Sequence, residues 1–401
     1  MSVFPALTET FVLREIQQLS ELGWNVTICQ LRPTRNDPLA TGFESLNGCV
    51  VYADIISTET LIGFLYCCYC HPRLTWDYLR LALSAISEPK KLAKIAYVLI
   101  VSMSLSYKFR HADLSHIRGH HLHNEALAAM FIAGFLGLPY SFTTHTVRTE
   151  YQRCVLNRIV MGAEFIVAIS DQVRTFLYSF GADVSRVKLI RNSVRLSDFH
   201  LRNMQLVEGT PVVLGIGRLD YKKGFHVLLR ACDLIRRRGV PFRCVIIGDG
   251  AERRNLIRLR SELQLTDVVD MVGRRAFSEV SAWLDRSTLL AVPSVVGPDG
   301  ATDGLPTVII EAFAKGVPVV GTRTAAIPEI VRNGLTGYLV PPDSPEQLAL
   351  CIGELLERRE LRDQFSIEAR RLVEREYDLE RNGRVLAMLM SAEMSKESSA
   401  S

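Results

Sequence analysis

The chain has 401 residues, of which 48% are hydrophobic and 22% charged, with a formal net charge of +4 and a pI of about 8.5. This length predicts about two globular domains, each with its own core, and the composition excludes disordered and fibrous classes. Without a concentrated basic stripe, the mild positive charge excludes nucleic acid as an expected partner, but it fits contact with an anionic membrane surface.

The cysteines and apolar segments bear on the compartment. Nine cysteines occur without regular spacing, and the group at 67, 68 and 70 lacks the second half of a zinc site, so we expect buried, reduced thiols in the cytoplasm. The first residues have neither the basic region nor the apolar core of a secretory signal. The longest apolar segment, 95–105, is shorter than a membrane span and predicts a buried helix; a membrane-surface helix preceded by Lys90, Lys91 and Lys94 is the alternative.

The first half begins with a helix at 7–23 capped by Thr8, a strand at 26–31 and a second strand at 50–52. Residues 60–108 are rich in helix without clear boundaries, and a short strand is expected at 111–116. Helices and strands then alternate, with helices at 125–136, 152–162 and 170–180, and strands at 140–144, 165–169 and 187–190.

An irregular stretch at 197–210 predicts the linker between two domains. The alternation beyond it is clear, with strands at 212–216, 243–247, 268–271 and 288–292, and helices at 224–238, 252–263 and 278–284. Strands that alternate with helices indicate a parallel sheet, whose ligands lie at the carboxyl ends of its strands. By this rule, five residues are expected to lie on one rim of the sheet: Gly217, Gly248, Gly273, Pro293 and Asp303. The tail at 374–394 is expected to be a charged surface helix.

The stretch 302–321 reads as loop, helix, turn and strand. Pro306 suits the first helical position, the helix is expected to continue over 307–315, and Gly316 is placed to end it. The positive end of such a helix stabilises a phosphate. Asp303 and Glu311 flank this end, and ionised carboxylates accept hydrogen bonds from hydroxyl groups. Phosphate together with hydroxyls suggests a sugar nucleotide, whereas the simpler alternative is that both acids only complement the helix dipole.

A second glycine-rich stretch, 215–224, follows a strand and opens a helix. Gly217 lets the backbone approach a phosphate, Arg218 offers a planar fork for its oxygens, and Lys223 offers a mobile point charge. The spacing matches neither a dinucleotide fingerprint nor a P-loop. A glycine turn with solvated basic residues is the alternative.

These motifs resemble the retaining glycosyltransferases of family 4. The segment 217–224 is similar to their diphosphate-binding segment, and Asp303 and Glu311 match their Glu-x7-Glu motif. The segments 325–339 and 4–12 are also similar, the latter to the bacterial exopolysaccharide and colanic-acid branch. The resemblance implies a GT-B fold, in which two Rossmann-like, doubly wound parallel-sheet domains face a cleft. We therefore expect an acceptor-side domain at 1–200, a donor domain at 206–373, and a helix and tail at 374–401 that pack back on the first domain.

The resemblance also implies roles for individual residues. Arg218 and Lys223 would hold the donor diphosphate, Glu311 the ribose hydroxyls and Asp303 the sugar hydroxyls. Around them, donor contacts are expected from Gly217, Gly304, Leu305 and Thr307, and base contacts from Gly273 and Arg274. His145 matches a histidine near the transferred sugar, so the expected catalytic set is His145, Arg218, Lys223 and Asp303; a satisfied strand-end histidine is the alternative for His145. No metal or cofactor is implied, and the histidines at 116, 120, 121 and 123 are expected to line the surface or the cleft.

The implied function is a hexosyltransferase-type retaining glycosyltransferase. It would move a sugar from a UDP- or GDP-sugar to a polysaccharide or lipid-linked saccharide, in the cytoplasm or peripherally on the cytoplasmic face of the membrane. The alternatives are a sugar-nucleotide epimerase and a nucleotide-sugar-binding protein that has lost catalysis.

Four features depart from the family pattern. Asp303 is one methylene shorter than the usual Glu, and Pro306 removes a phosphate-facing amide. Ala6–Thr10 replaces a glycine-rich acceptor loop. The start Met-Ser-Val-Phe-Pro is too short for the family's first strand, which raises the expectation that the N-terminal sheet lacks it.

Overall fold

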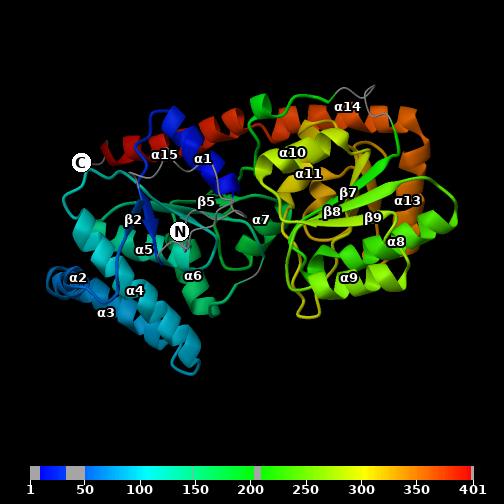
Figure 1. Cartoon of the computed structure of the whole chain (residues 1–401). Helices are drawn as coiled ribbons and strands as arrows, with labels where there is room; N and C mark the ends of the chain where they lie inside the picture. The colour runs from blue at the N-terminus through cyan, green and yellow to red at the C-terminus, as the bar shows by residue number, and fades with distance from the viewer. Residues whose placement is uncertain (1–9, 33–49, 148, 203–208, 399–401) are drawn as a thin grey trace. The chain divides into compact units, whose positions relative to one another are not determined.

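The computed structural model describes residues 10–32, 50–147, 149–202 and 209–398 (Figure 1). Contacts divide the chain into unit 1, Met1–Arg191 with Arg381–Ser401, and unit 2, Asn192–Glu380. The sequence placed the boundaries near residues 200 and 374. They differ because the Val194 amide donates to the Tyr377 carbonyl (3.0 Å) and the Leu379 amide donates to the Val194 carbonyl (3.0 Å), which ties both segments to unit 2.

Unit 2 contains a six-stranded sheet whose pairs are all parallel, in the order β12-β11-β10-β7-β8-β9. The strands are β7 (Val212–Ile216), β8 (Arg243–Ile247), β9 (Val269–Gly273), β10 (Leu289–Val292), β11 (Val319–Thr322) and β12 (Gly337–Val340). The predicted doubly wound sheet is therefore confirmed. Its chain order reverses between β7 and β10, which are neighbours at the centre of the sheet.

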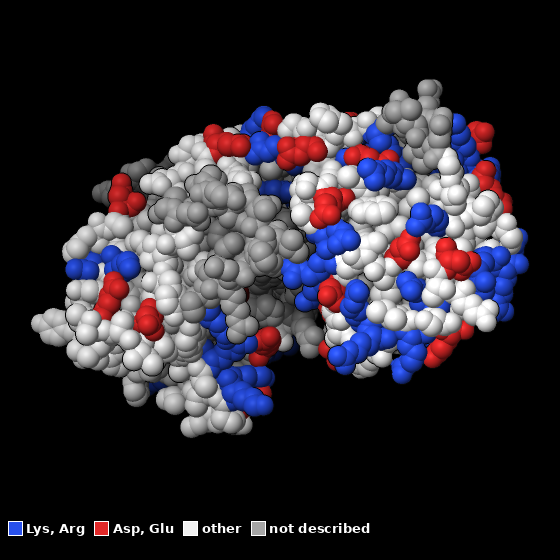
Figure 2. All heavy atoms as spheres, viewed as in Figure 1, with Lys and Arg blue, Asp and Glu red and all other residues white. Residues whose placement is uncertain are grey.

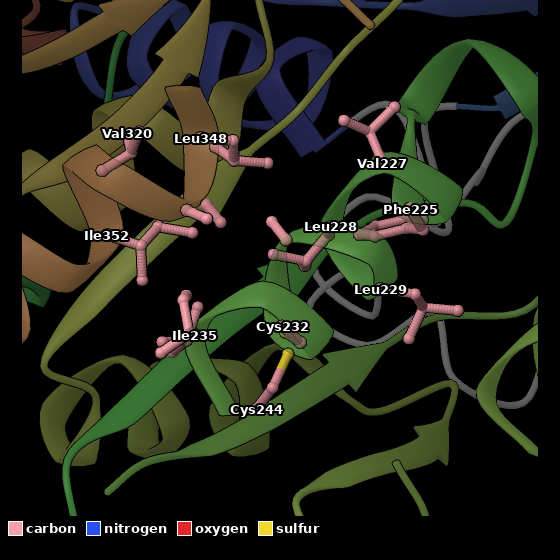
Figure 3. Packing of buried hydrophobic residues seen from close by; sticks show 14 of the residues in the cluster. Phe225, Val227, Leu228, Leu229, Cys232, Ile235, Cys244, Val320, Leu348 and Ile352 are labelled. Carbon is pink, nitrogen blue, oxygen red and sulfur yellow. The ribbon is translucent and has the colours of Figure 1, made fainter. Parts of the chain in front are cut away.

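Helices cover both faces of this sheet. They are α8 (Phe225–Arg237), α9 (Arg253–Glu262), α10 (Phe277–Arg286), α11 (Thr307–Ala314), α12 (Ile327–Ile330), α13 (Pro345–Glu357) and α14 (Arg359–Glu376). Figure 1 shows α8 and α9 on one side and α10 and α11 on the other. Apolar side chains of α8, such as Leu228 and Ile235, pack with Leu348 and Ile352 of α13 (Figure 3). This core holds β7 and α8 rigidly, and the loop between them carries candidate site residues.

Unit 1 is also built on parallel strands. Its two sheets have the orders β1-β2 and β3-β4-β5-β6. The strands are β1 (Ile28–Gln30), β2 (Val50–Tyr52), β3 (Ile117–His120), β4 (Tyr140–Thr144), β5 (Phe165–Ala168) and β6 (Val187–Leu189). The expectation of a missing first strand, the Thr8 cap and most of the replaced acceptor loop fall on residues 1–9, outside the described part of the chain.

The helices of unit 1 surround these sheets. They are α1 (Thr10–Glu21), α2 (Thr58–Cys70), α3 (Pro72–Leu83), α4 (Pro89–Phe109), α5 (Asn124–Leu136), α6 (Arg153–Gly162), α7 (Asp171–Tyr178) and, from Arg381 onward, α15 (Leu379–Ser398). The α15 side chains Leu386 and Met390 pack on Leu19 and Phe165, beside α1 (Figure 1). The single helix predicted at 374–394 is therefore wrong: its first residues belong to the end of α14, and the rest belongs to α15. The prediction of a surface helix is also wrong in part, because Leu386 and Met390 of α15 are buried.

The apolar segment at 95–105 lies within α4. By length and composition alone, α4 is the one helix among the described residues that is long and apolar enough to cross a membrane. Half of its apolar window is buried, and Ile95, Val98, Val101 and Leu105 are fully enclosed, in agreement with the predicted buried helix. It packs between α2 and α5.

Two local predictions in unit 1 are wrong. The strand expected at 111–116 lies at β3 instead, because the polar residues of β3 hide the strand pattern. Gly119 in β3 lets α5 approach the strand, since a Cβ added there would lie 3.0 Å from the Glu125 carbonyl oxygen. Of the three neighbouring cysteines, Cys67 is buried but Cys70 is exposed, because α2 contacts α4 with only one face. Burial raises the pKa of Cys67 to about 12.

Candidate active site

The candidate donor site lies where the strand order of unit 2 reverses. The carboxyl ends of β7 and β10 are neighbours there, and the helices that follow them, α8 and α11, lie on opposite sides of the sheet (Figure 1). In open parallel sheets the crevice outside such a switch point is the usual ligand site. The motif 215–224 begins at the end of β7, and the motif 302–311 lies in the connection from β10 to α11 and in the first part of α11.

Glycines bring the strand ends together on this rim. The Gly217 amide donates to the Ile247 carbonyl (3.0 Å), and the Gly248 amide donates to the Gly273 carbonyl (2.9 Å). A Cβ on Gly248 would lie 1.8 Å from the Gly217 carbonyl oxygen. Three of the predicted rim residues, Gly217, Gly248 and Gly273, therefore lie at the ends of three neighbouring strands.

The loop after β7 ends in a short 3₁₀ turn, η4 (Tyr221–Lys223), and Gly224. Gly224 has a φ of +67°, and a Cβ there would lie 1.8 Å from the Pro293 carbonyl oxygen. The β7 loop and the β10 loop are therefore in backbone contact, which requires glycine.

Replacing Gly224 by Ala is expected to lower the free energy of unfolding of unit 2 by about 2–5 kcal/mol, because the clash with Pro293 adds to the cost of a left-handed residue. Urea denaturation followed by circular dichroism measures this loss. Gly239→Ala is a matched control: its φ is +74°, but nothing lies within 4 Å of a Cβ added there, so only the backbone cost of about 1–2 kcal/mol remains. Equal losses in the two variants would contradict the close approach.

The second motif forms α11 and the loop before it. Pro306 is the N-cap residue with extended backbone, so the helix begins at Thr307, one residue later than predicted. It ends as predicted at Gly316, whose φ is +70°. The Gly316 amide donates to the Phe313 carbonyl (3.0 Å) and the Val317 amide to the Ala312 carbonyl (2.8 Å), which is a Schellman motif.

Lys223 and Asp303 form an ion pair between the two motifs. The side chains are 17% and 12% exposed, so both are largely shielded from water while remaining reachable. The Lys223 side chain also passes close to Gly217, whose added Cβ would lie 3.3 Å from Lys223 Cε. The adjacent Lys222 donates to the Thr302 carbonyl (3.3 Å). A cation, a carboxylate and a glycine backbone thus meet at the switch point.

The remaining predicted donor residues lie on the same elements. Arg218 is 61% exposed and pairs with Asp220 at 3.1 Å. Glu311 is buried in the second turn of α11. The others follow from the chain: Gly304, Leu305 and Thr307 lie in the loop before α11 and at its start, and Gly273 and Arg274 lie at the end of β9.

His145 lies in unit 1, directly after β4, and is 6% exposed. The Phe11 ring lies 4.4 Å from its ring and the His121 ring 4.8 Å, measured between centroids. Its Nε2 lies 3.5 Å from Nδ1 of His120. Within the described residues, His145 Nδ1 is buried and has no hydrogen-bond partner. The alternative of a fully satisfied strand-end histidine therefore does not hold for the described part of the chain.

A network that the sequence did not reveal supports His120. Glu15 of α1 accepts from Arg118 Nε at 2.7 Å and lies 3.4 Å from His120 Nε2, while Arg118 also donates to Thr143 Oγ1 at 2.6 Å. Burial raises the pKa of Glu15, but Arg118 and His120 outweigh the burial and hold it well below its usual range. His120 is buried, so of the two expected positions, surface or cleft, the surface is wrong for this histidine. Glu15 and Arg118 are 103 residues apart, and no sequence motif links them.

His145 is surrounded in a way that disfavours its charged form. Burial lowers the pKa of His145 well below its ordinary value, and the neighbouring His121 and His120 lower it further. No group of three or more His, Cys, Asp or Glu side chains is arranged to hold a metal ion in the portion of the chain that the structure describes.

The lowered pKa predicts a pH-dependent stability. A neutral His145 stabilises the fold fully above the pKa of an unfolded histidine, about 6.5, and this contribution is lost as the pH falls from there towards the folded pKa. The melting temperature of unit 1 should therefore fall between about pH 7 and pH 5.5, and should fall less steeply in His145→Gln. Differential scanning calorimetry across this range measures both slopes. If the melting temperature fell with pH equally steeply in the wild type and in His145→Gln, a buried, neutral His145 would be contradicted.

Comparisons with known proteins place these features in a family. A model described as "Glycosyl transferases group 1" matches residues 198–372. The "Putative colanic acid biosynthesis glycosyltransferase WcaL" of Escherichia coli (strain K12) is 30% identical over 409 residues, covering 97% of this chain and 98% of that protein. The "Amylovoran biosynthesis glycosyltransferase AmsK" of Erwinia amylovora is 28% identical over 195 residues, covering 49% and 48%.

Solved structures share the architecture. Anabaena Alr3699/HepE in complex with UDP and glucose superposes with a TM-score of 0.72 at 18% identity, covering 97% of this chain and 96% of that one. The lipopolysaccharide outer core galactosyltransferase WaaB superposes with a TM-score of 0.65 at 16% identity, covering 98% and 97%. The fold and the relatives together define the class of this protein: it is a glycosyltransferase with the GT-B fold. Within that class, the chain belongs to the glycosyl transferases group 1 family.

Proposed function

We propose that the protein is a retaining, metal-independent glycosyltransferase of family 4 that transfers a sugar from a UDP-sugar to a polysaccharide or lipid-linked saccharide acceptor. The observation that carries this proposal is the meeting of Lys223, Asp303 and the start of α11 at the switch point of unit 2. UDP and glucose in the Anabaena neighbour support a UDP-sugar, and the colanic acid and amylovoran relatives support a surface-polysaccharide acceptor.

The charges of the site suit a leaving diphosphate. As the bond between the sugar and the phosphate breaks, negative charge develops on the phosphate oxygens. Lys223, which is held by Asp303, and the positive end of α11 are fixed in unit 2, so they stabilise this charge with little reorganisation, and the exposed Arg218 would add a second cation. In this proposal these groups supply the positive charge that a metal ion supplies in other transferases.

The carboxylates serve the sugar and the ribose. Asp303 lies beside Lys223 and would accept hydrogen bonds from sugar hydroxyls, while Glu311 would accept them from the ribose. In unit 1, His145 would contact the transferred sugar. No residue is assigned as a covalent nucleophile; retention would follow from a front-face mechanism, in which the acceptor hydroxyl attacks on the side from which the diphosphate leaves.

The proposed function also includes the cellular compartment in which the reaction takes place. We place the reaction in the cytoplasm or on the cytoplasmic face of a membrane, with the acceptor carried on a lipid. The support is the biosynthetic context of the relatives named above.

Removing metals tests the mechanism. Transfer from UDP-sugars and, as a comparison, GDP-sugars to a membrane extract should proceed at an unchanged rate with excess chelator. Nuclear magnetic resonance of the product should show the anomeric configuration of the donor. Loss of transfer with chelator, restored by magnesium or manganese, would contradict metal independence, and an inverted product would contradict retention.

A further inference from the structure

The outer face of α2 is apolar although it faces solvent. Its inner face is fixed against α4, because a Cβ on Gly63 would lie 2.8 Å from Ser104 Cα and the Cys67 thiol lies 3.9 Å from the Met103 carbonyl oxygen. The opposite face follows the helical period and is exposed by 60%, 46%, 57% and 88% at Leu61, Ile62, Leu65 and Tyr69. A helix that is apolar all round needs a second apolar environment.

The next segments continue this exposure. Helix α3 buries Tyr78 and Ala82 but exposes Trp76 by 52% and Leu83 by 50%, and Ile86 after it is 69% exposed. The Arg80 guanidinium lies 5.2 Å from the Trp76 ring, so its stem and charge stand beside the aromatic ring. We call these seven exposed side chains the α2–α3 face: Leu61, Ile62, Leu65, Tyr69, Trp76, Leu83 and Ile86.

The charges around this face have a bias. Residues 72–94 carry five basic side chains and only two acidic ones, Asp77 and Glu88. The basic residues are Arg73, Arg80, Lys90, Lys91 and Lys94. Lys91 pairs with Glu88 at 2.6 Å and Lys94 pairs with Glu150, so the excess positive charge rests on Arg73, Arg80 and Lys90. On the side shown in Figure 2 the end of unit 1 that holds α2 and α3 is mostly uncharged, and Lys and Arg gather below it, near the start of α4.

We propose that the α2–α3 face docks on an anionic lipid surface. Leu and Ile would enter the headgroup and acyl boundary, Tyr69 and Trp76 suit the interface itself, and the flanking basic residues would meet anionic headgroups. An exposed apolar patch of this kind marks an interaction site, and its basic rim selects a lipid surface over a neutral protein partner. The acceptor side of this inference rests on the proposed function, since docking would bring the enzyme to a lipid-linked acceptor.

Vesicle flotation of the full chain tests this docking. The wild type should float with phosphatidylcholine vesicles that contain phosphatidylglycerol and much less with phosphatidylcholine alone. Leu61→Ser with Leu65→Ser should lower the partition coefficient by about tenfold or more. Leu350→Ser with Ile367→Ser is the matched control, since these unit 2 side chains are 55% and 45% exposed and should leave flotation unchanged. Unchanged melting temperature and UDP binding show that each variant is folded.

Three outcomes would overturn the proposal. The first is that the wild type does not float with the anionic vesicles, and the second is that the Leu61→Ser, Leu65→Ser variant floats as well as the wild type. The third is a dimer in sedimentation velocity that this variant converts to a monomer, because a second copy of the chain would then be the partner of the face. UDP binding in the same samples separates this from the proposed function: if UDP binds and flotation fails, only the docking is wrong.

A second inference concerns the hydrogen-bond chain from Glu15 to His145. Glu15 is an acceptor when ionised, so His120 Nε2 donates to it and His120 Nδ1 is left as an acceptor. His145 Nε2, which lies 3.5 Å from His120 Nδ1, must then carry a proton and donate it in a hydrogen bond to His120 Nδ1. We infer that Glu15 and His120 are positioning residues that fix the tautomer of His145, with the proton on Nε2 and an unprotonated Nδ1 that is buried and lacks a partner in the described residues.

The tautomer can be measured directly in the substrate-free protein. With histidine-selective ¹⁵N labelling, and with His145→Gln to assign the signals, His145 should show a protonated Nε2 and an unprotonated Nδ1. His120→Phe removes the acceptor and should mix the tautomers and lower kcat about tenfold, while UDP binding in unit 2 is unchanged. A protonated Nδ1 in the wild type, or an unchanged His145 spectrum in folded His120→Phe, would overturn this inference whether or not the protein transfers sugar.

Discussion

Replacing Glu311 by Ala should lower kcat/KM for transfer by about a hundredfold or more and leave the melting temperature close to that of the wild type. Glu311 is buried in α11 at the candidate donor site, and an ionised carboxylate accepts two ribose hydroxyls. Hydrogen bonds to a charged group contribute about 1.5–3 kcal/mol each, so losing two accounts for this factor. The ribose is remote from the bond that breaks, and the loss should therefore appear as weaker UDP binding, measured by titration calorimetry.

Glu311→Gln is the conservative control, because it keeps the size of the side chain and one acceptor oxygen. Its loss should lie between those of the wild type and Glu311→Ala. Glu346→Ala, at an exposed position in α13, should behave like the wild type. Full activity in folded Glu311→Ala would remove Glu311 from the donor site.

Replacing Lys223 by Ala should lower both UDP affinity and kcat, each by about tenfold to a hundredfold. The change removes a cation from the phosphate site and also leaves the Asp303 carboxylate without its partner, so the remaining negative charge repels the diphosphate. Stopped-flow measurement of UDP binding and initial-rate kinetics separate the two effects.

The double variant Lys223→Ala with Asp303→Asn distinguishes the roles of the pair. If Asp303 serves the sugar and Lys223 the diphosphate, removing the carboxylate charge should restore UDP affinity by about tenfold over Lys223→Ala, while transfer stays low. Asp303→Asn alone should keep UDP binding and lose transfer. Equal and additive losses of UDP binding in all three variants would contradict this division.

The donor half of the fold was predictable because its local signals agree. Strands β7, β8, β10 and β11 are mainly β-branched or aliphatic runs, and the predicted β7 and β8 match the observed bounds, whereas β12 was not predicted. Chain order predicts the rim on which the 215–224 and 302–311 motifs lie near each other, since both follow strands of one parallel sheet. The Lys223–Asp303 pair itself was not predictable, because it depends on side-chain reach across two loops.

The other half was harder for physical reasons. In α2 and α4 apolar residues lie on most sides of the helix, so periodicity gives no direction and the boundaries at 60–108 stayed open. The break between α14 and α15 depends on the pairing of Val194 with Tyr377 and Leu379, which are far apart in sequence. The Glu15–His120–His145 chain likewise joins three segments that no local pattern connects.

A thermal-shift screen of the purified chain against UDP, GDP and their sugar conjugates tests the central claim most directly, since a ligand that binds only the folded state raises the melting temperature by mass action. The account predicts a selective rise with UDP and with one or a few UDP-sugars, lost in Lys223→Ala and in Glu311→Ala. A cooperatively melting protein whose melting temperature no nucleotide or nucleotide sugar changes would contradict a nucleotide-sugar donor site at the switch point of unit 2.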